Sequence, residues 1–222
     1  VDPAREQLQV EPSGEWVCDV LVDAVFHQRV SLPVGDSTFH FSGWPEGEHV
    51  IEVYLPHDRP VRVNQVRVGG GAATPYRDER PRWVVYGSSI TQCGEADGPS
   101  ETWPALVANR FGLNLTSMGY GGNCHLEPMV NRLIARQPAD YISLCLGINV
   151  MGRCSLNDRT FRAAVLGTIV TIRDAHPDTP MAVVSPIYSK PRETEEGKNA
   201  VGLNLPMMRE WIAEAVDVLR AR

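Results

Sequence analysis

The sequence predicts an α/β protein in which a doubly wound parallel sheet, covered by helices on both faces, follows a small all-β domain. From about residue 82 onward, short apolar runs alternate with helix-length amphipathic segments, which is typical of repeated β-α units. Before that point, runs of period-two alternation are separated by turns rich in glycine and proline, which favours a β-sandwich. We therefore expect a β-sandwich domain over residues 1–80 and an α/β domain over residues 81–222.

Period-two alternation in the all-β region indicates strands with one buried and one exposed face. The first strands of a sandwich are incomplete here, so we expect the natural domain to begin upstream of Val1. A glycine-rich stretch over residues 69–75 ends the pattern and is interpreted as a linker. The alternating runs surround Val20 and Val22 and cover residues 49–55 and 61–68, with turn residues at 32–36, 43–47 and 56–60.

In the α/β region, each apolar run predicts a buried strand and each amphipathic segment predicts a helix packed on the sheet. Gly112 is expected to end the first long helix, and Asn204 with Pro206 is expected to open the last one. Strands are predicted over residues 83–87, 114–118, 141–146 and 181–186, and helices over 102–111, 126–137 and 158–175. The predicted inward-facing side chains are Met129, Val130, Leu133, Ile134, Val165, Ile169, Ile172, Met208, Trp211, Ile212, Val216 and Leu219.

The first strand of the α/β region ends in a turn that suits a catalytic serine. Val84, Val85 and Tyr86 form the apolar run, Gly87 permits a sharp strand-to-helix turn, and two serines follow. A serine at the carboxyl end of a buried strand stands beside unpaired backbone N–H groups. A serine nucleophile would be useful at that position.

Residues 87–91 read Gly-Ser-Ser-Ile-Thr, and this stretch resembles the first block of the SGNH, or GDSL-type, hydrolases and acyltransferases. That block reads Gly-Asp-Ser-hydrophobic-Thr, so the nucleophile position falls on Ser89, and Ser88 replaces the usual aspartate. The variant is similar to that of a branch with an N-terminal β domain. The stretches after the second and third strands resemble the second and third blocks, whose glycine and asparagine map to Gly122 and Asn149.

The resemblance covers residues 83–221 and implies a three-layer, flavodoxin-like fold. In its doubly wound strand order 2-1-3-4-5, the first strand lies between the second and the third. Ser89, Gly122 and Asn149 each follow one of these three strands, so we expect them to share one crevice. The Ser89 and Gly122 N–H groups and the Asn149 amide would then donate to one oxyanion, where losing one donor costs roughly 3–4 kcal/mol.

The general base that a serine nucleophile needs is missing from the motifs that this sequence shares with the family. The family's last block, Asp-x-x-His, does not appear at the expected place near the carboxyl end. Asp174 and His176 are one residue too close together, and they end a helix at the opposite rim, where the helix dipole explains a histidine. His125 follows Gly122 closely and is interpreted as a supporting or helix-start residue. We expect this sequence to lack a final segment with the Asp/His pair; the alternative is a catalytically inactive protein.

The composition of the chain argues against several classes of partner and of binding site. A net charge of −6 argues against a nucleic-acid partner, and no apolar run approaches the roughly 20 residues of a membrane span. Five cysteines without a Cys-x-x-Cys pair or a His/Cys cluster favour reduced thiols in the cytoplasm over disulfides or a metal site. The resemblance implies no metal and no organic cofactor.

The sequence and the resemblance together predict a serine-dependent acyl-ester hydrolase or acyltransferase that works through an acyl-enzyme on Ser89. One alternative is an acyltransferase that decorates a natural product such as a polyketide from a thioester donor, for which acyl-CoA is a candidate co-substrate. A second alternative, favoured by the absent base and the β domain, is a non-catalytic carbohydrate-binding protein. The expected partner is a small-molecule ester, thioester or hydroxyl acceptor, and the oligomeric state is left open.

Overall fold

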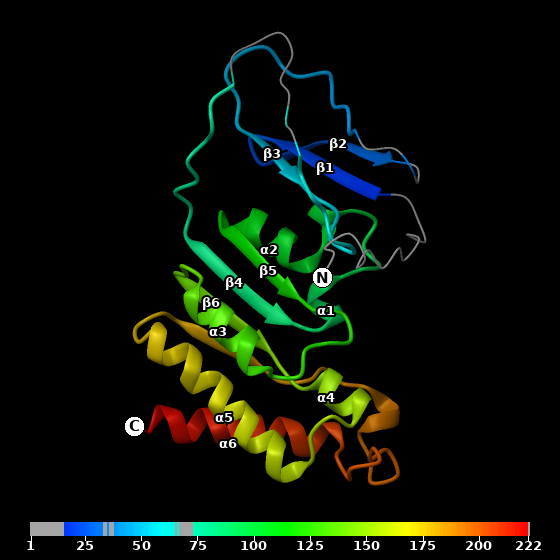
Figure 1. Ribbon diagram of the computed structural model, residues 1–222, viewed down its shortest axis with the longest axis vertical. Coiled ribbons are helices and arrows are strands. Elements are labelled where there is room, and N and C mark those ends of the chain that lie inside the picture. Colours follow the sequence, from blue (N-terminus) through cyan, green and yellow to red (C-terminus); the bar gives the residue numbers. More distant parts are fainter. Residues whose placement is uncertain (1–15, 33–34, 36–37, 65, 67–72, 222) are drawn as a thin grey trace, which may run out of the picture. The chain divides into compact units, whose positions relative to one another are not determined.

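The computed structural model describes residues 16–32, 35, 38–64, 66 and 73–221, which form two compact units (Figure 1). The first unit holds the described residues up to Thr74 together with Asp97–Ser100. The second unit holds Pro75–Ala96 and the described residues from Glu101 onward. The predicted linker lies largely outside the described residues, and so do residues 1–15.

The first unit contains an antiparallel sheet of three strands in the order β2-β1-β3. The central strand β1 (Trp16–Val22) pairs with β2 (Val25–Leu32) and with β3 (Ile51–Tyr54). Asp23 and Ala24 join β1 to β2 with positive φ angles of 50° and 64°, the backbone that a two-residue hairpin turn with the right-handed strand twist requires.

The predicted strands near Val20 and at residues 49–55 are present as β1 and β3, but β2 was not predicted. Its sequence shows no clean alternation because β2 is an edge strand with few buried side chains. The strand predicted over residues 61–68 was wrong for its described residues, which lie outside any strand. Alternation alone does not form a strand without a neighbouring strand to pair with. The described residues of the first unit show one sheet, so the β-sandwich remains a prediction.

The second unit is built on a parallel sheet of four strands in the order β5-β4-β6-β7 (Figure 1). The strands are β4 (Arg82–Gly87), β5 (Asn114–Gly119), β6 (Tyr141–Cys145) and β7 (Met181–Val184). The first strand of the unit, β4, lies between the second and the third, as the doubly wound order predicts. The carboxyl ends of β4, β5 and β6 therefore meet at one edge of the sheet.

Local sequence signals explain where the long helices begin and end. The side chains of Thr102, Asn157 and Asn204 each accept a hydrogen bond from a backbone N–H of the first turn that follows. Gly112 ends its helix in the left-handed conformation, with φ +62°. The helices are α1 (Ser89–Gln92), α2 (Trp103–Phe111), α3 (Pro128–Arg136), α4 (Ile148–Arg153), α5 (Asp158–Ala175) and α6 (Leu205–Arg220), with short 3-10 helices at Pro99–Glu101 and Lys190–Arg192.

Helices cover both faces of the parallel sheet. Alternate residues of β4 point to opposite sides, so Val84 and Tyr86 join one core cluster and Trp83 and Val85 join another. The larger cluster is closed by α3, α5 and α6, and the smaller one by α2. As predicted, Val165, Ile169, Ile172, Met208, Trp211 and Ile212 are buried, and Val216 and Leu219 pack partly buried against this core.

The predicted inward face of α3 was wrong in part. Met129 and Leu133 are exposed, at 71% and 44% of their surface, whereas Ile134 is fully buried. The buried face of this helix also contains Asn131, whose Nδ2 donates to Thr168 Oγ1 of α5 over 2.9 Å. Asn131 thus lies on the buried face of α3, at a position that hydrophobic periodicity assigns to the exposed face. The observed buried face is therefore rotated about the helix axis relative to the predicted one.

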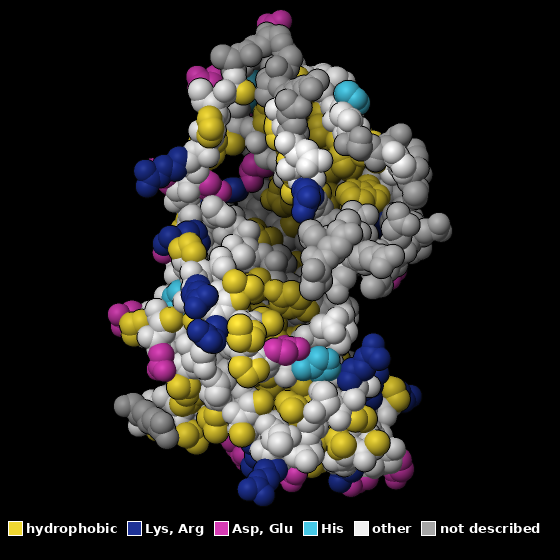
Figure 2. Space-filling view, viewed as in Figure 1, with side chains coloured by type: hydrophobic (Ala, Val, Ile, Leu, Met, Phe, Trp, Pro, Cys, Tyr) yellow, Lys and Arg dark blue, Asp and Glu magenta, His cyan; other side chains and the backbone are white. Residues whose placement is uncertain are grey.

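Two surface properties concern the predicted partners. Among the described residues, no helix combines the length and the apolar character that crossing a bilayer requires. On the face shown in Figure 2, acidic and basic side chains are interspersed, and no continuous basic field covers that part of the described surface. The absence of a nucleic-acid partner stays a prediction.

Candidate active site

The turn after β4 places Ser89 in the open. Ser88 is 2% exposed and caps α1, since its hydroxyl accepts the Ile90 N–H over 3.2 Å. Ser89 is the first residue of α1 and is exposed. Cys93, in the left-handed conformation, closes this short helix by donating its N–H to the Ser89 carbonyl over 2.8 Å. Where the family motif has aspartate, this chain therefore uses Ser88 to hold the turn.

The loop after β5 packs directly against α1. Tyr120 donates its N–H to the Gly87 carbonyl over 2.8 Å, which fixes the start of the loop to the end of β4. A Cβ atom built on Gly121 would lie 3.9 Å from Ser89 Cβ and 2.5 Å from Gln92 Oε1. Glycine at this position lets the loop backbone approach the Ser89 side chain closely.

Gly122, the predicted oxyanion donor, is held by its carbonyl group. Its φ of +72° favours glycine, and its carbonyl oxygen accepts from His125 Nε2 over 3.0 Å. Because a carbonyl can only accept, Nε2 carries the proton, and Nδ1 is 2.8 Å from the Ser155 hydroxyl. His125 thus braces the Gly122 peptide against Ser155, in agreement with the supporting role predicted for it.

Asn149, the third predicted residue, lies in the first turn of α4, after Gly147 with φ +106°. Its Oδ1 accepts the Cys124 N–H over 3.0 Å, which joins the loop after β6 to the loop after β5. Since Oδ1 is engaged, the orientation of the amide group is fixed. The Nδ2 group then remains the part of the side chain that can donate to a substrate.

The structure places the three predicted residues on adjoining segments at one edge of the sheet. Ser89 faces Gly121, Gly122 is the next residue, and Asn149 is bonded to Cys124 two positions further on. The convergence of their donors on one oxyanion stays a prediction.

The general base is not found among the described histidines, because none of them hydrogen-bonds Ser89 in the described part of the chain. His176 caps the C-terminus of α5 and precedes β7, so it lies at the opposite edge of the sheet. Arg173 Nη1 donates to its carbonyl over 2.9 Å, which fits the predicted helix-end role.

A polar network that sequence reasoning missed lies beneath the loop after β5. Tyr86 is fully buried, and its hydroxyl donates to Glu127 Oε2 over 3.1 Å. The same carboxylate oxygen accepts the His125 N–H over 3.1 Å. Burial raises the pKa of Tyr86, so its hydroxyl stays protonated and continues to donate. The signal for Glu127 was its place before Pro128, at a helix start.

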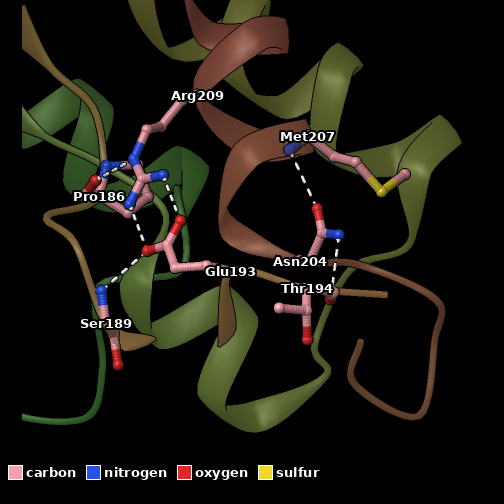
Figure 3. A network of polar contacts seen from close by, with 7 residues as sticks. All are labelled: Pro186, Ser189, Glu193, Thr194, Asn204, Met207 and Arg209. Atoms are coloured by element: carbon pink, nitrogen blue, oxygen red, sulfur yellow. Dashed lines mark hydrogen bonds and ion pairs between the residues drawn. The ribbon is translucent and has the colours of Figure 1, made fainter. Parts of the chain in front are cut away.

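The connection that follows the carboxyl end of β7 and leads to α6 is held by a network of polar contacts (Figure 3). Arg209 donates to both carboxylate oxygens of Glu193, over 2.7 and 2.8 Å, and to the Pro186 carbonyl over 2.8 Å. Glu193 also accepts the Ser189 N–H over 2.8 Å. Pro186 packs against Gly147, where a Cβ atom would approach its ring to 2.8 Å. The Glu193 side chain is therefore held in place by this network and not free in solvent.

The Glu193–Arg209 pair predicts a pH-dependent contribution to stability. The bidentate hydrogen bonds from Arg209 lower the pKa of Glu193 from 4.5 to about 2. A carboxylate with a lowered folded-state pKa stabilises above its unfolded value, and the contribution disappears as the pH falls from about 4.5 towards 2. Glu193→Gln is expected to lower the melting temperature at pH 7, with a difference from the wild type that shrinks with acidification. Thermal unfolding followed by circular dichroism between pH 2 and pH 7 measures this.

Glu210, the exposed neighbour of Arg209 on α6, supplies the control for this measurement. Glu210→Gln removes one negative charge at nearly the same place and should change the melting temperature little at any pH. A difference between Glu193→Gln and the wild type that stays constant across the pH range would contradict the assigned pairing.

Comparison with protein-family models matches residues 80–221 to the GDSL-like lipase/acylhydrolase family. The chain belongs to this family. The match covers the parallel sheet, the turn with Ser89 and the segments with Gly122 and Asn149. A search of curated protein sequences found no significant match.

Three solved structures are similar to this chain over 93–96% of its length. The salicylyl-acyltransferase SsfX3 from a tetracycline biosynthetic pathway is 30% identical, with a TM-score of 0.79 over 96% of this chain and 60% of its own. A protein described as GDSL-like lipase from Bacteroides ovatus is 23% identical, with a TM-score of 0.62 over 93% of this chain and 60% of its own. A family 2 carbohydrate esterase with a carbohydrate-binding domain from Corynascus thermopiles is 17% identical, with a TM-score of 0.69 over 93% and 75%. The chain thus spans 60% of the length of the first two.

Proposed function

We propose that this GDSL-family protein is a serine-dependent acyl-transfer enzyme in which Ser89 attacks the carbonyl carbon of an ester or thioester. Family membership and the exposed position of Ser89 on its turn support the proposal. The observation that carries it is the Asn149 Oδ1 to Cys124 N–H hydrogen bond. That bond ties the second and third motif blocks together and leaves the Asn149 Nδ2 group to donate to a substrate.

In the proposed reaction, the Ser89 hydroxyl gives its proton to a general base while Oγ forms a bond to the carbonyl carbon. The carbonyl oxygen becomes a tetrahedral oxyanion that accepts from the N–H groups of Ser89 and Gly122 and from Asn149 Nδ2. Collapse breaks the bond to the leaving alcohol or thiol, which takes up the proton, and an acyl-enzyme remains. We assign the base to none of the described residues.

The second half of the reaction decides between hydrolase and transferase. Water as acceptor gives the free acid, whereas a hydroxyl of a natural product such as a polyketide gives an acylated product. The 30% identity to an acyltransferase from a tetracycline pathway favours transfer from a thioester donor such as an acyl-CoA. Incubation with a thioester donor and a hydroxyl acceptor separates the two, because a transferase yields the new ester and a hydrolase yields only the acid.

Labelling with a fluorophosphonate tests the nucleophile directly. We expect the gene-encoded full-length protein to take up one adduct, which peptide mass spectrometry locates on Ser89, and Ser89→Ala to take up none. Ser155 is an informative control because it is an exposed serine beside a histidine, at 2.8 Å from His125 Nδ1. Ser155→Ala should still take up its adduct on Ser89. An adduct on Ser155, or no adduct on the intact protein, would refute the assignment of Ser89.

A further inference from the structure

The strand β1 of the first unit contains a carboxylate with no exposed surface. The Asp19 side chain is 0% exposed and accepts from Arg29 Nε over 2.7 Å and from Arg29 Nη2 over 3.1 Å. Its Oδ2 also accepts the Ser100 N–H over 3.0 Å and the Ser100 hydroxyl over 2.6 Å. Burial alone would raise the pKa of Asp19, but these bonds outweigh it and leave the pKa lowered. A buried charge kept in this way is fully paired, and removing one partner is costly.

Ser100 belongs to a segment that leaves the second unit and returns to it. Residues 97–100 group with the first unit, whereas the residues before and after them belong to the second. A Cβ atom on Gly98 would lie 2.2 Å from Arg29 Nη2, so the guanidinium fills the space that any side chain would need. Two contacts with the first unit thus hold this segment: the Arg29 guanidinium packs against Gly98, and the Asp19 carboxylate accepts hydrogen bonds from Ser100.

The same segment is part of the connection between α1, which begins with Ser89, and α2. At the α1 end, Cys93 donates its N–H to the Ser89 carbonyl over 2.8 Å. At the α2 end, Trp103 Nε1 donates to the Ile90 carbonyl over 2.8 Å. The serine turn is therefore fixed locally at both ends of the connection, and the midpoint of the connection is fixed by Asp19.

We propose that Asp19 is a positioning residue for the nucleophile: by holding Ser100, the first unit restrains the connection that keeps α1 and Ser89 in place. The inference rests on the function proposed for Ser89 and assigns the first unit a part in the reaction. Nucleophile placement matters steeply, because a shift of about 1 Å can cost a factor of 10² in rate. In this role Asp19 acts through Ser100 and the chain and does not itself contact the substrate.

Two variants of different severity test the proposal. Asp19→Asn keeps the shape and removes the charge, and Ser100→Ala removes only the hydroxyl that donates to Asp19. Both are expected to slow fluorophosphonate labelling of Ser89 at least about tenfold at a temperature where the protein is fully folded. In ester turnover, kcat should fall while KM stays within about twofold. Ser100→Thr keeps a hydroxyl and should restore the rate. Asp58→Asn breaks another carboxylate–arginine pair in the first unit, with Arg59, and should leave the rate unchanged.

Hydrogen exchange of the peptides that cover residues 89–103 supplies a readout that does not depend on activity. Faster exchange of these peptides in Ser100→Ala, with the exchange of α5 and α6 unchanged, supports the positioning role. This result would stand even if the wild type does not label at Ser89. Failure of the wild type to label would refute only the proposed function. Unchanged exchange and an unchanged labelling rate, with only a lower melting temperature, would overturn the inference and leave Asp19 a purely structural residue.

Discussion

Asn149→Ala is expected to lower kcat for ester turnover by about 10²–10³-fold while KM changes little, because in the proposed reaction the amide donates only to the oxyanion of the transition state. The structure makes this residue a sharp probe, since Oδ1 is engaged by the Cys124 N–H at 3.0 Å and the amide has a single orientation. Steady-state kinetics with a p-nitrophenyl ester measure the effect, with Ser89→Ala as the inactive reference.

Asn149→Asp separates the donor from the structural hydrogen bond. The aspartate can still accept the Cys124 N–H, so the link between the two loops persists, but it offers no donor and adds a negative charge beside the developing oxyanion. We expect this variant to be at least as impaired as Asn149→Ala while its melting temperature stays near that of the wild type. Near-normal turnover in Asn149→Asp would show that Asn149 serves only to hold the loops and would remove it from the oxyanion site.

The parts of the fold that depend on local chemistry were predictable from the sequence. Gly112 ends α2 and Asn204 caps α6 because left-handed glycine and side-chain capping are decided within one turn of chain. The strand order was predictable because buried parallel strands joined by helices have few topologies. The inner face of α3 was not predictable in this way, since Asn131 is buried only because Thr168 of α5 satisfies its amide.

In the candidate site, too, the residues set by local sequence and topology were predictable, and those set by long-range contacts were not. Ser89, Gly122 and Asn149 stand next to strand ends, so a motif and a topology together place them at one edge. The residues that hold them could not be read from spacing. His125 on the Gly122 carbonyl, Glu127 beneath it and Asp19 on Ser100 join positions far apart in the chain or depend on one backbone orientation, and only coordinates show such pairs.

Gly119→Ala is expected to disrupt the serine turn without changing any motif residue. A Cβ atom at this position would lie 2.3 Å from Gln92 N and 2.5 Å from Gln92 Cα, which are backbone atoms of α1 and cannot rotate away. Gly119 pairs with Gly87 across β4 and β5, and a Cβ on Gly87 would lie 2.1 Å from Thr91 Oγ1. The first helix thus rests on two facing glycines, and a methyl group must push α1 away from the sheet.

Because α1 begins with Ser89, this displacement should lower the rate of fluorophosphonate labelling by about 10²-fold or more and the free energy of unfolding by about 1–3 kcal/mol. Gly167→Ala is the matched control: it adds the same methyl group in the middle of α5, where a Cβ meets nothing within 4 Å. That variant should gain about 0.5–1 kcal/mol and label normally. Urea unfolding and labelling kinetics of both variants measure these effects. Normal labelling in Gly119→Ala would mean that α1 need not lie against the sheet for Ser89 to react.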